Sequence, residues 1–273
     1  MNQDRIRSRS NDLGVSHPSG MTGHNLITVA SGKGGVGKTW FSITLSHALA
    51  RAGRKVLLFD GDLGLANVDI QLGLTPVHDL GEALAGRRTF KDVVTRSADT
   101  GVDVVAGRSG SARLADARSE ELELIRRGLV AIGQFYDHVV IDLGAGVDRG
   151  VRALAANAGP TLVITTDEPT AMTDAYALIK LLHAALPRTD FRVVVNMAEN
   201  RAEGERTFQK LQAACENFLK VRPKLAGVVR RDPHVPDAIR RQVPLMKRHP
   251  ITAASEDVEA IARSLMAEKQ AAN

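Results

Sequence analysis

A glycine-rich loop is the feature of this sequence that most constrains its fold. An apolar segment beginning at Asn25 leads into Gly32–Thr39, which matches the pattern G-x-x-x-x-G-K-[ST], and a helical segment follows from Trp40 to Ala50. Glycines in such a loop can take positive φ and turn backbone N–H groups towards a phosphate, where the helix N-terminus adds partial positive charge. Strand, loop and helix in this order predict a nucleotide site. The alternative is a flexible Gly/Lys loop that matches the pattern by chance.

The loop supplies the first candidate binding residues. Lys38 is expected to reach the β- and γ-phosphates of a nucleotide, and the Thr39 hydroxyl is expected to bind Mg²⁺. A generic phosphate loop accepts almost any residue at the position of Lys33, so a solvated lysine is the alternative there. The predicted ligands are ATP and Mg²⁺, and the predicted contacts within the loop are Gly32, Lys33, Gly34, Gly35, Val36, Gly37, Lys38 and Thr39.

Composition allows one large α/β domain or two small ones. The chain has 273 residues, of which 44% are hydrophobic and 25% charged, as in ordinary globular proteins. It contains no run of about 18 uncharged apolar residues, so no membrane-spanning helix is expected. A single cysteine, Cys215, excludes an internal disulfide and a cysteine zinc cluster and favours a reducing cytoplasm. Residues 1–24 are predicted to be a disordered basic arm, and residues 25–273 the folded domain.

Short apolar runs separated by helical segments continue along the chain after the loop. A helix is predicted from Glu120 to Gly133 with Ser119 as its N-cap, and an amphipathic helix over Ser255–Met266. The runs predicted as strands are Lys55–Asp60, Gly101–Ala106, Asp137–Asp142, Thr161–Thr166, Phe191–Asn196 and Leu225–Val229. Near-continuous Val/Ile/Leu strands alternating with helices predict one doubly wound, mostly parallel sheet covered by helices on both faces.

Three aspartates follow predicted strands. Ligands of open parallel sheets gather at the carboxyl ends of the strands, so Asp60 and Asp62 are expected beside the loop. Asp62 is the candidate for positioning the attacking water and contacting the metal, with Asp60 in support, although capping of the next turn explains Asp60 equally well. Asp142 is expected to contact Mg²⁺, and Gly144 and Gly146 to allow a switch loop that senses the γ-phosphate.

The run Lys33-Gly-Gly-Val-Gly-Lys-Thr39 resembles the deviant phosphate loop of the MinD/ParA superfamily of dimerising ATPases. The stretches Asp60–Pro76, Thr166–Leu182 and Val195–Ala198 resemble more closely the FlhG/FleN branch, MinD-like ATPases that control flagellar number. This resemblance implies an ATP-dependent homodimer in which Lys33 contacts the nucleotide of the opposite subunit and Asp62 governs hydrolysis. It also implies an adenine site with Asn196 and Asp232, and the alternative for Asn196 is a turn residue after a strand.

The sequence departs from the family pattern at several places. Leu143 follows Asp142 where the family has a small or hydroxyl residue, and Arg230 replaces a proline common after that strand. Met1–Arg7 resembles only loosely the segment through which some relatives stimulate a signal-recognition-type GTPase. The C-terminal helix has too little apolar surface for a membrane anchor, so we expect it to pack on the domain and membrane binding to be weak or absent.

Three classes of function fit these features. The first is a regulatory ATPase switch, for which the family implies a flagellar transcription activator, an FlhF-type GTPase and flagellar switch-complex proteins as partners. The second is a ParA-type partitioning ATPase that binds DNA non-specifically as a dimer, which the net charge of +5 does not establish. The third, a metabolic ligase, is disfavoured by Lys33 and the flagellar-type stretches. The expected location is the cytoplasm, with polar or transient membrane association left open.

Overall fold

A computed structural model describes residues 25–62, 64–107, 117–156 and 159–272. Within these residues eight strands form one sheet in the order β3-β4-β2-β5-β1-β6-β7-β8. Neighbouring strands are parallel except β3, which pairs antiparallel with β4 at one edge. The strands are β1 (Leu26–Ser31), β2 (Val56–Gly61), β3 (Val94–Ser97), β4 (Val102–Val105), β5 (His138–Ala145), β6 (Thr161–Thr165), β7 (Phe191–Ala198) and β8 (Lys224–Arg230).

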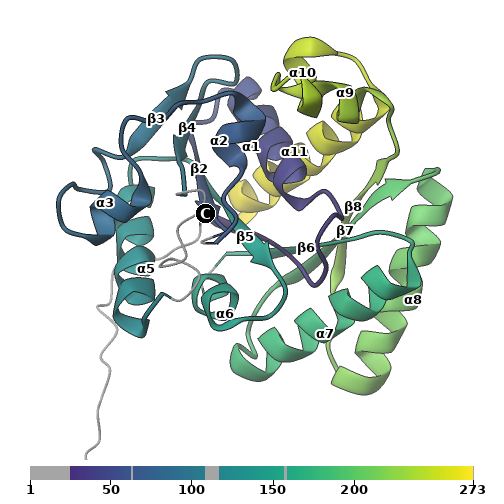
Figure 1. Cartoon of the computed structure of the whole chain (residues 1–273). Helices are drawn as coiled ribbons and strands as arrows, with labels where there is room; N and C mark the ends of the chain where they lie inside the picture. The colour runs from purple at the N-terminus through teal and green to yellow at the C-terminus, as the bar shows by residue number, and fades with distance from the viewer. Residues whose placement is uncertain (1–24, 63, 108–116, 157–158, 273) are drawn as a thin grey trace, which may run out of the picture.

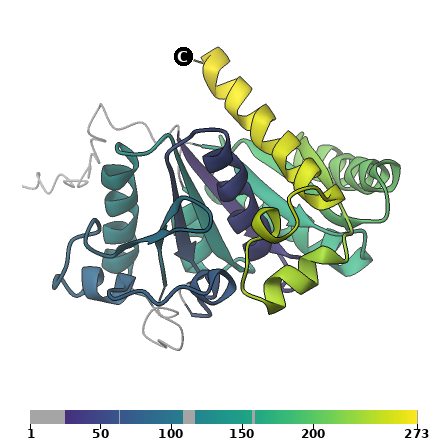
Figure 2. The same cartoon turned by 90° about the horizontal axis from the view of Figure 1, so that it is seen from above.

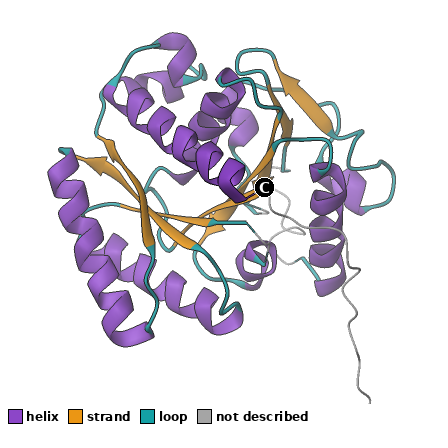
Figure 3. Cartoon of the chain, turned by 180° about the vertical axis from the view of Figure 1, so that it is seen from behind, coloured by secondary structure: helices purple, strands orange, loops and turns teal. Residues whose placement is uncertain are grey.

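Helices cover both faces of the sheet (Figures 1 and 3). Alternation along β1 explains the two layers, because Leu26 and Ala30 join the apolar cluster under α5–α8 whereas Ile27 and Val29 join the cluster under α1 and α11. The helices are α1 (Lys38–Arg51), α2 (Val68–Leu72), α3 (Leu80–Leu84), α5 (Ser119–Gly133), α6 (Arg149–Ala155), α7 (Pro169–Ala185), α8 (Arg201–Leu219), α9 (His234–Arg240), α10 (Leu245–Arg248) and α11 (Ala253–Ala272). The predicted doubly wound, mostly parallel fold is confirmed.

Some sequence predictions differ from the structure in detail. Ser119 is the first residue of α5 and not its N-cap, which is Arg118, whose backbone N–H donates to the Glu121 carboxylate at 2.8 Å. Strand β3 was not predicted, because its four residues carry one large apolar side chain, Val94. The predicted disordered arm, residues 1–24, lies outside the described residues.

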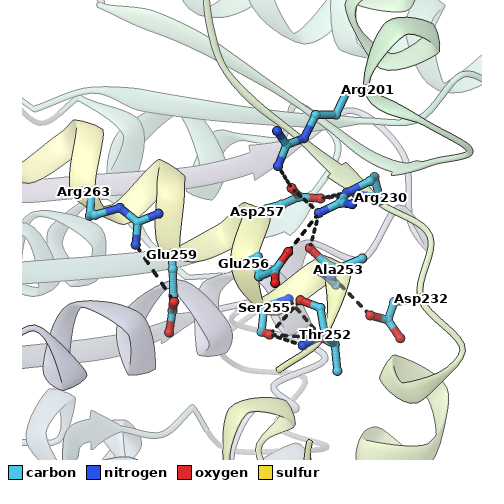
Figure 4. A network of polar contacts seen from close by, with 11 residues as sticks. Arg201, Arg230, Asp232, Thr252, Ala253, Ser255, Glu256, Asp257, Glu259 and Arg263 are labelled. Carbon is cyan, nitrogen blue, oxygen red and sulfur yellow. Dashed lines mark hydrogen bonds and ion pairs between the residues drawn. The ribbon is translucent and has the colours of Figure 1, made fainter. Parts of the chain in front are cut away.

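The C-terminal helix packs along the domain, as predicted. Its apolar face, formed by Val258, Ile261, Ala262 and Leu265, is buried against α1 and β8. Figure 4 shows how its first turns are held: the Arg230 guanidinium and backbone N–H both donate to Asp257, which also accepts from Arg201. Burial raises the pKa of Asp257, but the hydrogen bonds from Arg230 outweigh burial and hold it below its ordinary value. Arg230, which replaces a family proline, therefore clamps α11 to the end of β8.

The far end of α11 extends beyond the rest of the domain (Figure 2). None of the helices in the described ranges has both the length and the apolar character needed to cross a bilayer.

Candidate functional site

The phosphate loop connects the end of β1 to the start of α1. Gly35 and Gly37 have φ of +82° and +85°, a region that favours glycine. No heavy atom lies within 4 Å of where a Cβ on Gly34 or Gly35 would stand, so the loop is open there. On its other side the Asn196 amide, from β7, donates to the Val36 carbonyl oxygen at 2.8 Å. The loop is thus held at Val36 by β7 and is open at Gly34 and Gly35.

Lys38 and Asp142 form a buried ion pair beneath the loop. The Lys38 ammonium lies 3.4 Å from Asp142 Oδ1, which also accepts a hydrogen bond from the Ser42 hydroxyl at 2.9 Å. Burial raises the pKa of Asp142, and the charge of Lys38 opposes this. Lys38 and Ser42 meet the same carboxylate because residues four apart share one face of a helix.

The surroundings of Asp142 fit a divalent cation. Its second oxygen, Oδ2, is buried and has no hydrogen-bond partner among the described residues, and the Thr39 side chain lies against the same carboxylate. Carboxylate and hydroxyl oxygens are the ligands that Mg²⁺ prefers. Thr39 and Asp142 would therefore hold the metal, whose chemistry is to neutralise charge on the phosphates.

Asp60 and Asp62 lie at the same edge of the sheet but differ in their contacts. Asp60 is fully buried and accepts hydrogen bonds from the backbone N–H groups of Asp62, Asn67 and Val68. It thus caps the turn before α2, the alternative left open for it. Burial and then the neighbouring Asp142 raise the pKa of Asp60 to about 7. Asp62 is partly exposed, and a Cβ on Gly144 would stand 3.4 Å from its carboxylate oxygen.

Lys33 is held by its own chain in this structure. Its ammonium lies 2.7 Å from Glu168 Oε2 and 2.9 Å from the Thr170 hydroxyl, at the start of α7. Hydrogen bonding from Lys33 lowers the pKa of Glu168. Helix α7 approaches the loop so closely that a Cβ on Gly32 would stand 2.1 Å from the Asp174 carbonyl oxygen. Both side chains of the Lys33–Glu168 pair are exposed, and such pairs contribute little net stability, so little free energy holds this contact together.

The residues predicted at the adenine site have internal partners. Asn196 is buried and holds the loop through Val36, and the residue after it, Met197, has φ of +57°, which is unusual for a side chain of this size. Asp232 accepts from the His234 and Ala254 backbone N–H groups. Burial raises the pKa of Asp232, but these hydrogen bonds outweigh burial and lower it. Base contact by Asn196 and Asp232 stays a prediction.

Gly37→Ala is expected to destabilise the protein by about 2 kcal/mol, because it adds strain at positive φ and a Cβ that would stand 2.4 Å from the Asn196 amide nitrogen. Urea denaturation measures this. The matched control is Gly53→Ala, which has φ of +79° and open space around the added Cβ, so it carries only the strain, about 1 kcal/mol. Equal losses for the two variants would contradict the role of the Asn196 contact.

Sequence reasoning missed four residues of this site. Ser42 could have been found from its spacing of four residues after Lys38 on α1. Glu168 and Thr170 lie in a stretch used only for its family resemblance, and nothing in it indicated a contact with Lys33. Met197 carries no local signal for a left-handed backbone.

Comparison with known proteins places this geometry in a family. The model of the CobQ/CobB/MinD/ParA nucleotide binding domain matches residues 27–245. The chain is 38% identical over 253 residues to the antiactivator FleN of Pseudomonas aeruginosa, covering 93% of this chain and 88% of FleN. It is 29% identical to the flagellum site-determining protein YlxH of Helicobacter pylori, covering 88% of this chain and 81% of YlxH. The predicted resemblance to the FlhG/FleN branch is confirmed.

Solved structures agree with this assignment. The cell division ATPase MinD of Pyrococcus furiosus superposes with a TM-score of 0.77 at 24% identity, covering 90% of this chain and all of that one, which shows the fold. The septum site-determining protein MinD of Pyrococcus horikoshii, solved with Mg-ADP, gives a TM-score of 0.75 at 25% identity over 90% of this chain and 98% of that one. The predictions of an ATPase domain with ATP and Mg²⁺ as its cofactors are confirmed. The chain belongs to the CobQ/CobB/MinD/ParA family of nucleotide-binding ATPases.

Proposed function

We propose that this protein is an ATP-dependent dimerising switch that regulates the number or placement of flagella through partner proteins. The observation that supports this best is the pairing of two lysines at one loop: Lys38 is buried on Asp142, and Lys33 is held at the surface by Glu168. Lys38 is placed to serve the nucleotide of its own chain. In this proposal Lys33 leaves Glu168 and contacts a nucleotide bound to a second copy.

In this proposal both lysines change partners. Lys38 does so when ATP binds, and Lys33 does so when the dimer forms. Arriving phosphates attract Lys38 away from Asp142, which frees a carboxylate beside Thr39 for Mg²⁺. A facing second copy offers Lys33 the phosphates of its nucleotide in place of Glu168. Asp62, which lies next to Gly144, positions the attacking water. Hydrolysis then removes the γ-phosphate that held the two copies together. Dimer lifetime is thus set by a slow hydrolytic step.

The proposed partners are those that the family resemblance implies: a flagellar transcription activator, an FlhF-type GTPase and switch-complex proteins. Support comes from the similarity to FleN, named an antiactivator, and to YlxH, named a flagellum site-determining protein. A cytoplasmic location, with recruitment to a cell pole, is part of the same proposal. Counting flagella on cells that lack the protein tests this role, and an unchanged number and position would contradict it.

Lys33→Ala is expected to abolish the ATP-dependent dimer while leaving ATP binding to the monomer nearly unchanged, because Lys33 serves only the nucleotide of the other copy. Size-exclusion chromatography with light scattering, using ATP and Mg²⁺ in an Asp62→Ala background, measures the dimer. Lys224→Ala is the matched control, since Lys224 is an exposed lysine at the start of β8, the opposite edge of the sheet. A Lys33→Ala dimer of wild-type affinity would refute the proposal.

A further inference from the structure

A pocket of 380 Å³ lies at the edge of the sheet opposite the phosphate loop. Its walls are the end of α1 with the residues leading into β2, and the turn between β3 and β4. We call it the basic pocket, because four of its lining side chains are cationic: Arg51, Arg54, Lys55 and Arg96. The 14 residues of α1 separate it from the loop by about 21 Å. It is therefore independent of the nucleotide site and of the proposed function.

Two of the four cations have carboxylate partners and two do not. Arg51 pairs with Glu259 at 2.9 Å, and Arg96 pairs with Asp103 at 2.9 Å. Among the described residues, the side chains of Arg54 and Lys55 form no ion pair. The Lys55 ammonium lies 4.9 Å from the centre of the Tyr136 ring, and the Asp137 carboxylate accepts a hydrogen bond from the Lys55 backbone N–H. The pocket thus keeps an excess of positive charge.

Arg54 gives a second and independent sign of a ligand. Its Nε is buried and has no hydrogen-bond partner among the described residues. The guanidinium as a whole lines the pocket and has no ion-pair partner among the described residues, so it is available to an oxyanion that enters there. A guanidinium fork matches the geometry of phosphate oxygens, and hydrogen bonds between charged partners are the strong ones.

A second pocket of 380 Å³ adjoins the first and shares Lys55 with it. We call it the apolar pocket, because its wall includes Phe90, Ile132, Phe135 and Tyr136. Phe135 is 65% exposed, so its ring is accessible to an apolar group that enters this pocket. A cationic pocket beside an apolar one matches a molecule that has a phosphate group at one end and hydrocarbon at the other.

We propose that the basic pocket binds the phosphate group of an anionic phospholipid, with the hydrocarbon next to the headgroup contacting the apolar pocket. This site does not use the C-terminal helix, whose apolar face is buried against the domain. It offers membrane contact through the edge of the sheet that faces away from the nucleotide.

Co-sedimentation with vesicles tests the proposal. The full chain, held with saturating Mg-ADP, is mixed with vesicles of phosphatidylcholine alone or with added phosphatidylglycerol. Binding is expected only to the second kind. Arg54→Glu should weaken it about thirtyfold, because each basic side chain near an anionic surface contributes about a factor of five and charge reversal counts twice. Arg54→Gln, which keeps most of the volume, should weaken it about fivefold.

The matched control is Arg240→Glu, the same charge reversal at an exposed arginine of α9, near the nucleotide edge, and it should bind vesicles like wild type. Equal binding to both kinds of vesicle, or wild-type binding by Arg54→Glu, overturns the proposal. Thermal melts of each variant show that it is folded.

Titration with inorganic phosphate distinguishes a lipid headgroup from a soluble phosphate compound as the ligand of the basic pocket. Inorganic phosphate is titrated into the protein while Mg-ADP occupies the phosphate loop. If the basic pocket binds phosphate, calorimetry should record heat of binding for wild type and none for Arg54→Glu. Phe135→Ala should leave this heat unchanged and weaken vesicle binding about tenfold through lost apolar contact. Unchanged vesicle binding by Phe135→Ala overturns the lipid assignment and leaves soluble phosphate as the source.

Discussion

Asp62→Ala is expected to lower kcat for ATP hydrolysis by about a hundredfold or more, while ATP affinity stays within about twofold of wild type. Phosphoryl transfer depends on positioning, and Asp62 is a partly exposed carboxylate beside Gly144, whereas Asp60 is buried and held by backbone N–H groups. Steady-state phosphate release and equilibrium binding of a fluorescent ATP analogue measure the two quantities. In the presence of ATP the variant should accumulate as a dimer.

Asp69→Ala is the control for this prediction, because it removes a carboxylate from α2, a few residues further along the same segment. It should hydrolyse ATP at close to the wild-type rate. Among the described residues Asp62 accepts one hydrogen bond, from the Leu65 backbone N–H at 3.1 Å, so its loss should lower stability by about 1 kcal/mol at most. Turnover retained by Asp62→Ala would remove this residue from the hydrolytic step.

Lys38→Met should abolish ATP binding and also lower the free energy of unfolding of the nucleotide-free protein by about 3 kcal/mol near neutral pH. The variant leaves the Asp142 carboxylate buried without its cation, and a buried charge that loses its partner is strongly destabilising. Urea denaturation without nucleotide measures the loss. Asp142→Asn combined with Lys38→Met should recover most of it, since both charges are then gone.

The cost of Lys38→Met should depend on pH in a defined direction. Burial raises the pKa of Asp142 in the folded protein, and loss of Lys38 raises it further. A carboxyl with a raised folded pKa destabilises the fold when it is ionised, so the penalty is complete above the folded pKa and vanishes below the unfolded value of about 4. The variant should therefore lose less stability at about pH 5 than at about pH 8. A loss of unfolding free energy that does not change with pH would contradict the coupling between Lys38 and Asp142. The same holds if the losses of the two single variants simply add up to the loss of the double variant.

The sheet was predictable because its strands are buried on both faces. The central residues of β5 and β7, Val139–Ile141 and Val193–Val195, are all Val or Ile, and such uninterrupted apolar runs are typical of parallel strands that helices cover on both faces. Strand β3 is at the edge and makes one antiparallel pairing with β4, so its short polar sequence carries no such pattern. Helix α5 begins with an N-cap provided by backbone geometry and by Glu121, which the preference for serine at caps does not reveal.

The candidate site was predictable where the chemistry is local and not where it is long-range. The loop follows from its motif, and Asp60 and Asp142 follow from their places at the ends of the predicted strands Lys55–Asp60 and Asp137–Asp142. The contact of Lys33 with Glu168 joins residues 135 positions apart, and no spacing rule connects them. The family resemblance implies that Asn196 contacts the base. In the structure its amide is already bonded to the Val36 carbonyl oxygen, a contact that only the packing of β7 against the loop determines.

The amide bridge from Asn196 to the Val36 carbonyl has a consequence for affinity. Fixing a loop residue in one backbone conformation costs about 1–2 kcal/mol, and a loop that was disordered before binding would lose that amount at several positions when the ligand arrived. Here the Asn196 amide on β7 already holds the Val36 carbonyl oxygen, so this part of the loop has a fixed backbone conformation before a nucleotide binds. Nucleotide binding can then be fast and tight, because this part of the loop does not have to become ordered first. The conformational changes that remain are those in which two copies of the chain come into contact.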